Sequence, residues 1–529
     1  MAARIPALIL ATTLLATATG QTSPGLSMKP IREDEWTRDA AAHLLRRAAF
    51  GGTPEQIERL HLGGMDAAVS SLLSHSTDEY KPPQPAIDPI LNEPPDRAAL
   101  RVMTDEERRE QQQKRQMAER RSIEEVRLWW LDRLAHSPFP AEEKLVLFWH
   151  GHFTSGVREV RNAIYMKEQN EMFRSKALGN FRDLLIAVSK DRAMLVYLDN
   201  ARNVKRSPNE NYARELLELF TLGLGNYTEN DVKAAARAFT GWGFDQDGFL
   251  FRRDQHDFDE KTFLGRRGRW DGGEIIDILL TKNECSQFLA RKLLGFYVRP
   301  DPPRSLVNAF AAVIRRNKYD IRASLDVLFR SQAFYHADSR GCLIKSPTEL
   351  LIGAVRQFEL PLVDLLGAER ALAGMGQELM QPPNVKGWDG GEKWINTATL
   401  FARYNVVSSL LRGETSAGGR RFRAQAGRDN DEEAGSMMAM TARSRMAAGT
   451  PTAYDPLQAL RGAATTPEDI VDFFTRHLLA TPLPSIKREQ LIDYVRGPGG
   501  SFSPSARDTA ERIRTLVQLL TATPEYQLN

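Results

Sequence analysis

The stretch that decides the fold runs from Ser207 to Phe244 and reads SPNENYARELLELFTLGLGNYTENDVKAAARAFTGWGF. Ser207 is a favourable N-cap residue, Pro208 fits the first helical turn, and Glu210 completes a capping-box pattern. The apolar residues that follow recur with helical spacing, and Gly223 is a typical helix terminator. The first half of the stretch therefore predicts one capped helix.

The second half predicts another helix of the same kind. Thr228 and Asp231 have the spacing of a capping box, and Gly241 lies where the helix should end. A similar start occurs far upstream, where Thr53 precedes a proline and Gln56 follows three residues later. Helical patterns of this sort continue along almost the whole chain.

Signals for strands are scarce. The best hairpin candidate is the segment 243–258, GFDQDGFLFRRDQHDF, which alternates around the turn pair Asp247–Gly248. We therefore predict a mainly α protein. It should have a multi-helix, bundle-like body with at most a small hairpin, plus a short C-terminal helical unit.

Composition divides the chain into segments. Residues 30–410 should form the main helical domain. Residues 411–455 are rich in Gly, Arg, Ala and Met without hydrophobic periodicity, which predicts a disordered insertion. Residues 456–529 read as a helix, a connection and a helix that ends before an aromatic residue. The same pattern occurs in residues 286–335, so the tail is a candidate repeat of that segment.

The N-terminus has the pattern of a secretory signal peptide over residues 1–20. Arg4 supplies a positive charge, Ile5–Ala16 is a mostly apolar run, and Ala18–Gly20 offers small residues for cleavage. No later stretch is apolar over the length of a membrane span. We expect an exported protein, periplasmic or extracellular, without a membrane span.

Composition also excludes several classes of function. The 71 basic and 68 acidic residues nearly cancel, which argues against a nucleic-acid binder. Cys285 and Cys342 are the only cysteines, and the sequence leaves open whether they form a disulfide. No haem-attachment motif, phosphate-binding loop, dinucleotide fingerprint or serine-hydrolase elbow is present. Haem, nicotinamide and nucleotide cofactors are therefore not expected.

A polar stripe lies on the first predicted helix of the opening stretch. Asn211, Arg214, Glu215 and Glu218 have the spacing of one helix face. One interpretation is a solvent face on which Arg214 pairs with Glu218. The other is a polar cluster in which the carboxylates share a divalent cation or act as an acid/base pair.

Histidines supply two further candidate clusters. In LVLFWHGHF, His150 should end a helix and Gly151 should break it. A His-x-His pair on extended backbone would then place His150 and His152 on one side, as metal sites need. In QHDFDEKTFLG, His256 adjoins Asp257 in a loop. Structural histidines packed beside aromatic residues are the alternative in both places.

Five blocks of the chain, taken in order, resemble a large bacterial family catalogued as domain of unknown function 1800. The blocks are HLLRRAAFGGTPEQIERL, FWHGHF, PNENYARELLELFTLGLGNYTENDVKAAARAFTGW, HDFDEKTFLG and PPNVKGWDGGEKWINTATLFARYN. The resemblance covers about Asp39 to Leu411. The residues that fall in these blocks are His150, His152, Asn209, Asn211, Arg214, Glu215, Glu218, Asp231, His256, Asp257, Trp388 and Trp394.

The resemblance implies a mainly helical, mostly exported protein with no assigned catalytic residues. It also implies a neighbouring gene for a second exported protein that looks sulfatase- or alkaline-phosphatase-like.

The pentapeptide WDGGE occurs twice, at residues 270–274 and 388–392. In the first copy Asp271 is a plausible N-cap, because an apolar helical pattern follows at once. In the second copy the periodic run begins only after Asn396, so the glycines should form a tight turn between Trp388 and Trp394. The second copy is thus predicted to present two indoles to a ligand.

Two hypotheses for function follow. The first is an exported hydrolase- or lyase-like enzyme that acts on an extracellular polymer such as a polysaccharide. Its candidate catalytic groups are Glu215, Glu218, His150 and His256, its candidate substrate-binding groups are Arg214, Asn211, Asn209, Trp388 and Trp394, and its candidate metal ligands are His150, His152 and Asp257. The second is a non-catalytic assembly or secretion partner of the neighbouring sulfatase-like protein. An open pocket where these groups converge would favour the enzyme.

Overall fold

The structure is a computed structural model, and it describes residues 26–74, 82–92, 97–414, 453–460, 464–497, 502 and 507–529. The predicted signal peptide at 1–20 lies outside the described residues. So does most of the predicted insertion at 411–455, because description stops after 414 and resumes at 453.

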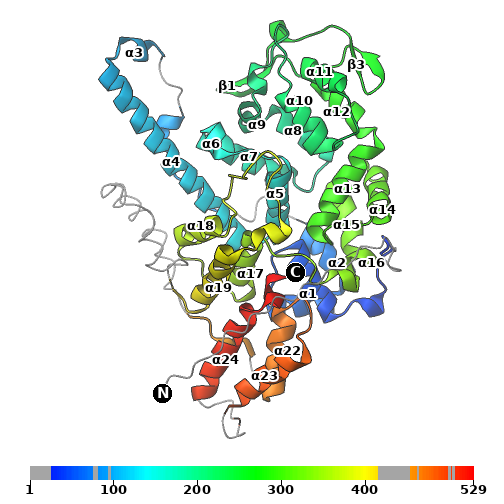
Figure 1. Cartoon of the computed structure of the whole chain (residues 1–529), viewed down its shortest axis with the longest axis vertical. Helices are drawn as coiled ribbons and strands as arrows, with labels where there is room; N and C mark the ends of the chain where they lie inside the picture. The colour runs from blue at the N-terminus through cyan, green and yellow to red at the C-terminus, as the bar shows by residue number, and fades with distance from the viewer. Residues whose placement is uncertain are drawn as a thin grey trace.

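Helices dominate the N-terminal part of the chain (Figure 1). In order these are η1 (Glu33–Glu35), α1 (Arg38–Ala48), α2 (Pro54–Leu73), η2 (Pro89–Leu91), α3 (Arg97–Val102), α4 (Asp105–His136), α5 (Pro140–His152), α6 (Val157–Val160), α7 (Ala163–Lys176), α8 (Phe181–Lys190), α9 (Arg192–Tyr197) and η3 (Asn200–Arg202). The capping box of Thr53 and Gln56 starts α2 as predicted. Helix α4 projects from the body, with α3 at its outer end. Its charged first half is mostly exposed, whereas Trp129 and Trp130 near its end are buried in the core.

The middle of the chain continues the helical pattern and adds two small hairpins. The elements are α10 (Asn211–Glu215), η4 (Leu216–Thr221, a π-helical turn), α11 (Glu229–Ala238), β1 (Trp242–Asp245), β2 (Gly248–Phe251), η5 (Arg253–Gln255), β3 (Lys261–Phe263), β4 (Arg266–Gly268), α12 (Gly272–Leu280), α13 (Asn283–Tyr297), α14 (Arg304–Arg316), α15 (Ile321–Arg330), α16 (Gln332–Tyr335) and η6 (Ala337–Ser339). The mainly α prediction is confirmed.

The first hairpin is the predicted one, although its turn lies one residue earlier. Asp245 pairs with Gly248, so Gln246 and Asp247 form the two-residue turn. The second hairpin was not predicted. Its turn contains Leu264, a residue type that is unusual at a positive φ of 48°, and the Leu264 amide donates to the Asp231 carboxylate at 2.6 Å.

The opening stretch forms its two helices, but the first starts later than predicted. Ser207 forms an isolated bridge with Val204 instead of capping a helix. The Asn209 side chain accepts a hydrogen bond from the Asn211 amide at 2.9 Å, and α10 begins there. The predicted capping box at Ser207 was therefore wrong. The second box, of Thr228 and Asp231, starts α11 as predicted.

The remaining elements close the body and form the C-terminal unit. They are α17 (Pro347–Gln357), α18 (Leu365–Gly374), η7 (Gly391–Trp394), α19 (Thr397–Leu411), α21 (Pro456–Leu460), α22 (Pro467–Leu478), α23 (Ser485–Arg496), α24 (Arg507–Thr521) and η10 (Pro524–Gln527). Successive helices pack on one another in α13–α15 and again in α22–α24. The proposed repeat stays a prediction.

Residues 527–529 are hydrogen-bonded to the body. The Asn529 amide donates to the Leu343 carbonyl at 2.8 Å, and the Lys345 amide donates to the Gln527 carbonyl at 2.8 Å. The buried guanidinium of Arg46 in α1 donates to the carbonyls at the end of α22. The C-terminal unit is thus joined to the body through backbone and side-chain bonds.

None of the described helices combines the length and the apolar character that a membrane crossing needs. Cys285 and Cys342, both described, are separate thiols, which answers the question the sequence left open.

Candidate functional site

The polar stripe on α10 and η4 is bonded within the chain. Arg214 reaches both oxygens of Glu229 at 2.8 Å and Glu210 at 3.1 Å, so the expected pairing with Glu218 was wrong. Glu218 instead accepts a hydrogen bond from the Tyr227 hydroxyl at 2.9 Å. Most of the stripe is therefore a half-exposed face whose charges are already compensated.

Glu215 is the exception within the stripe. Burial and the nearby charge of Glu218 raise the pKa of Glu215 above its ordinary value, while Arg214 and Lys386 act in the opposite direction. The influence of Lys386 matters for position, because that residue lines the cleft described below. Glu215 does not itself line the cleft, and the charge of Lys386 is what relates it to the cleft.

The two histidines of FWHGHF lie on a helix. Helix α5 continues through Gly151 to His152, so the expected extended backbone was wrong. Side chains two residues apart on a helix point in different directions, so the two imidazoles diverge. His150 is buried against Trp130 with ring centroids 4.4 Å apart, and its Nε2 is bonded to the Asn170 amide at 3.0 Å. Burial and the charge of Arg174 lower the pKa of His150 to about 3, so the ring is neutral at physiological pH.

His152 is also buried, and burial together with the charge of Lys292 lowers its pKa to about 3. Its Nε2 is bonded to the Phe220 carbonyl at 3.1 Å, whereas its buried Nδ1 has no hydrogen-bond partner among the described residues. His152 differs from His150 in lining a cavity.

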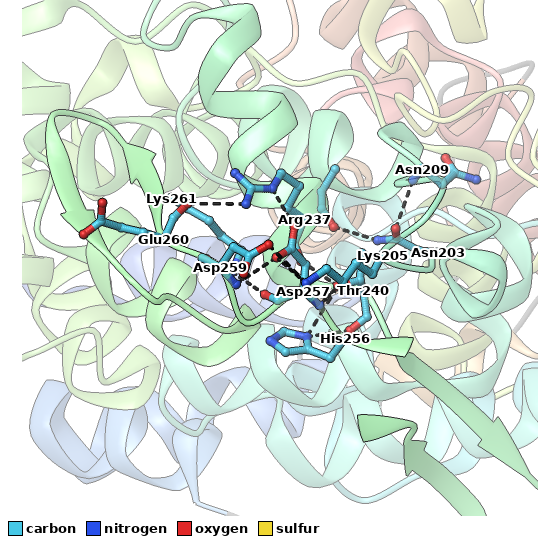
Figure 2. A network of polar contacts seen from close by, with 11 residues as sticks. Asn203, Lys205, Asn209, Arg237, Thr240, His256, Asp257, Asp259, Glu260 and Lys261 are labelled. Carbon is cyan, nitrogen blue, oxygen red and sulfur yellow. Dashed lines mark hydrogen bonds and ion pairs between the residues drawn. The ribbon is translucent and has the colours of Figure 1, made fainter. Parts of the chain in front are cut away.

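His256 and Asp257 belong to a network that fixes a loop against α11 (Figure 2). The His256 Nδ1 is bonded to the Thr240 carbonyl at 2.7 Å, and the Asp257 amide donates to the Thr240 hydroxyl at 2.8 Å. Arg237 donates to the Asp257 carboxylate at 2.7 Å, and Lys261 donates to the Asp257 carbonyl at 2.5 Å. These bonds describe a structural loop.

Asn209 lies at the edge of the same network (Figure 2). Its amide donates to the Asn203 side chain at 2.9 Å, and Asn203 in turn donates to the Ala236 carbonyl at 2.8 Å. Asn209 thus connects the start of α10 to α11. Among the described residues no three His, Cys, Asp or Glu side chains are grouped to hold a metal ion, and the divalent metal stays a prediction.

A cleft of about 620 Å³ brings three of the predicted residues together. We call it the indole cleft. It is lined by Leu147, Phe148, Gly151, His152, Arg291, Lys292, Gly295, Phe296, Pro300, Asp301, Pro302, Leu343, Ile344, Ser346, Glu349, Gln377, Lys386, Trp388, Asp389, Gly390, Gly391 and Trp394. Its walls come from α5, α13, the start of α17 and the loop that precedes α19.

The second WDGGE copy forms one wall of the indole cleft. Gly390 and Gly391 have positive φ values of 74° and 55°, which form the predicted turn between Trp388 and Trp394. Trp394 is buried and Trp388 is half-buried. Asn396 then caps α19, as predicted.

The first WDGGE copy forms the start of a helix. Asp271 caps α12 in a capping box with Glu274, which confirms the separate interpretation of the two copies.

Three cations face the indole cleft without an ion pair among the described residues: Arg291, Lys292 and Lys386. The protein atoms around Lys292 lower the pKa of its ammonium by desolvation, although part of the side chain stays open to solvent. Asp301, Glu349 and Asp389 also line the cleft, so it is an aromatic-walled recess that presents both cations and carboxylates.

One residue of the indole cleft, Glu349, forms a buried ion pair. Lys144 lies 2.9 Å from the Glu349 carboxylate. Burial pushes the pKa of Glu349 upward, but the charge of Lys144 and hydrogen bonds from Ser346 hold it below its ordinary value. Glu349 is therefore an anion that compensates the buried Lys144, and Arg291, Lys292 and Lys386 have no ion pair with it among the described residues.

Sequence reasoning found the indoles and His152 but missed the cations. Lys386 lies two residues before Trp388 in the same block, so its proximity could have been noticed. Arg291 and Lys292 come from a different helix and carry no local signal.

Comparison of the chain with curated proteins and with solved structures finds no significant match. A family model described as "Protein of unknown function (DUF1800)" matches residues 43–528, which is nearly the whole chain. The match extends beyond the five motif blocks and includes the C-terminal unit. The chain therefore belongs to the DUF1800 family of proteins of unknown function.

Proposed function

We propose that this protein is exported and binds an acidic polysaccharide in the indole cleft. The observation that carries the proposal is the half-buried indole of Trp388, backed by the buried Trp394, beside three cations that have no ion pair among the described residues. Indole faces stack on the apolar faces of sugar rings, and lysine and arginine bind their carboxylate or sulfate groups. The cleft volume of about 620 Å³ is in the usual range for a small-ligand site.

The same side chains support a lyase-like reaction, β-elimination beside a uronate carboxylate. Arg291 and Lys386 would neutralise that carboxylate, which makes the proton on the adjacent ring carbon more acidic. Lys292 has a lowered pKa, so a larger fraction of it is the neutral amine that can accept this proton. The freed electron pair forms the ring double bond, the glycosidic C–O bond breaks, and the departing oxygen takes up a proton. Glu215, close to Lys386, is the candidate from the stripe for that last step.

A non-catalytic role is the alternative. Its support is that Arg214, Glu218 and His150 are all bonded within the chain. In that case the cleft would hold an anionic partner without turnover, for example the neighbouring exported sulfatase-like protein that the resemblance implies.

The test is a binding screen of the mature protein against polygalacturonate, alginate, hyaluronate and chondroitin sulfate, with dextran as the neutral comparison. We expect salt-sensitive binding to an acidic polymer that Lys386→Met and Trp388→Ala each weaken about tenfold. Lys233→Met, which removes an exposed charge on α11, is the matched control. Absence of binding to every acidic polymer would overturn the proposal.

Catalysis is read separately, from the ultraviolet absorbance of unsaturated uronate products. We expect Lys292→Met to abolish product formation. Binding without any unsaturated product would reject the lyase reaction and leave the non-catalytic role, which co-purification with the sulfatase-like protein would then support.

A further inference from the structure

A second cavity, of about 1020 Å³, runs along the projecting helix α4. We call it the arm groove, defined by Arg108, Gln112, Arg115, Gln116 and Arg120 of α4 and by Arg158 of α6. Figure 1 shows α4 leading away from the body on the side of α6. The groove therefore lies between this arm and the body.

The groove face of α4 is set by helical spacing. Arg108, Gln112, Gln116 and Arg120 follow one another at four-residue intervals, and Arg115 lies three residues after Gln112, so they share a face. From Arg108 to Arg120 the helix rises roughly 18 Å, which is enough for several sugar rings in a row. The face offers guanidinium and amide groups that bond carboxylates and hydroxyls, and Glu119, Ile123 and Glu124 of the same helix also line the groove.

Segment 82–92 holds the arm, in part through the groove residue Arg115. The Arg115 guanidinium donates to the Ile90 carbonyl at 2.7 Å, and the Ser122 hydroxyl accepts from the Asp88 amide at 3.0 Å. Segment 82–92 thus supports α4, and the groove face stays open.

Charge differs between the two ends of the groove. At the inner end Arg127 lies 2.6 Å from Glu378 and 3.4 Å from Glu369, and Arg158 lies 2.8 Å from Glu378. Further out, Arg120 has no ion pair among the described residues, and the Glu119 carboxylate accepts the Ala163 amide at 2.5 Å. In the outer part of the groove Arg115 and Arg120 therefore outnumber Glu119, although Arg108 is paired with Asp105 at 3.4 Å, whereas the inner arginines are paired with Glu369 and Glu378.

We propose that the arm groove is a second binding site for an extended acidic polysaccharide. The ligand class rests on the proposed function of the indole cleft. The backbone N–H groups of α4 are hydrogen-bonded within the helix, so α4 offers no strand edge with which a peptide could pair. Recognition in the groove therefore comes from side chains. Guanidinium groups match carboxylates, and the glutamine amides match hydroxyls.

The arm groove and the indole cleft are lined by two adjacent residues of the chain. Gln377 lines the cleft and the next residue, Glu378, lines the groove. Gln377 is fixed by the amide and hydroxyl of Thr348, each at 2.9 Å. A polymer held in one site thus lies next to the other, and a long chain gains affinity by contacting both.

The test compares di- and octagalacturonate binding to the full-length mature protein by calorimetry. Arg115→Gln with Arg120→Gln removes two charges from the groove face. The matched control is Arg109→Gln with Arg121→Gln, which removes two exposed charges from the same helix at positions that do not line the groove. Arg120→Gln alone guards against an effect on folding, because this side chain has no ion pair among the described residues.

We expect the groove pair to weaken octamer binding at least about tenfold, with dimer binding unchanged. The control pair should leave both unchanged. Equal loss for dimer and octamer, or no loss for the octamer, overturns the groove. Poly-glutamate is the peptide comparison. If it binds more strongly than the octamer and the same variants abolish its binding, the groove is a peptide site and the polysaccharide assignment is overturned. If groove variants weaken the octamer while Lys386→Met does not, the groove stands and the indole cleft fails.

Discussion

Gly387 and Gly151 lie back to back, so that a Cβ on Gly387 would collide with the carbonyl oxygen of Gly151. Gly387 also has a φ of 90°, which side chains disfavour. This contact fixes the Trp388 loop on the end of α5, with the Trp388 ring over Gly151.

Gly387→Ala should therefore displace the indole wall. We expect a loss of about 1–3 kcal/mol in the free energy of unfolding and weaker ligand binding in the cleft. Gly225→Ala is the matched control, because Gly225 has a φ of 84° but open space around it. Thermal unfolding and binding together check this. Equal effects of both variants would show that φ strain alone is responsible.

The buried histidines predict acid sensitivity. His150 and His152 have folded pKa values of about 3, well below the ordinary value of 6.5, because burial disfavours the charged ring. The unfolded chain binds more protons between these values, so stability is full above pH 6.5 and falls as pH drops toward 3. Urea unfolding across this window measures the effect. His150→Phe should flatten the slope, and an unchanged slope would contradict the assignment.

Lys345 predicts a change of stability with pH in the alkaline range. This buried lysine lies 3.9 Å from the Tyr526 ring centroid, and burial together with the charge of Arg46 lowers its pKa to about 7. The unfolded lysine binds its proton up to about pH 10.5, so Lys345 should make stability rise with pH between 7 and 10.5. Lys345→Met should remove this rise and stabilise the protein at pH 7, as urea unfolding midpoints would show. Lys233→Met should keep the rise.

The Lys144–Glu349 pair predicts strong coupling. Glu349→Gln leaves Lys144 buried without its carboxylate, which should cost about 3–5 kcal/mol of unfolding free energy. Adding Lys144→Met should restore much of that loss, because both charges are then gone. A double-mutant cycle by urea unfolding measures the coupling, and additive losses would show that the two side chains do not depend on each other.

The loop network predicts a structural role for Asp257. Asp257→Asn weakens the bond from Arg237 and should lower the unfolding free energy by about 1–3 kcal/mol. Ligand binding in the indole cleft should not change, since Asp257 does not line it. A selective loss of binding at full stability would instead give Asp257 a functional role.

Sequence patterns predicted the fold well where the signal is local. The caps at Thr53, Thr228, Asp271 and Asn396 were all confirmed, because each depends on residues within one helical turn. Ser207 failed because Asn209, two residues on, competes for the same role.

The site was harder to predict, because its parts converge only in three dimensions. Gly151 was expected to break α5, but the helix continues to His152, and the Gly151 carbonyl packs against Gly387 of the Trp388 loop. Lys292 and Glu349 reach the cleft from α13 and α17, and no spacing in the sequence relates them to Trp388. The indoles were found because they lie in one short loop.

The pairing of residues 527–529 with the body affects the order in which the protein folds. Leu343 and Ile344 line the indole cleft, and they are held by backbone pairing with Leu528 and Asn529. A ribosome must translate the chain as far as Asn529 before this wall can be fixed. The cleft is therefore completed through contacts of very high sequence separation, and it should be among the last parts of the protein to form.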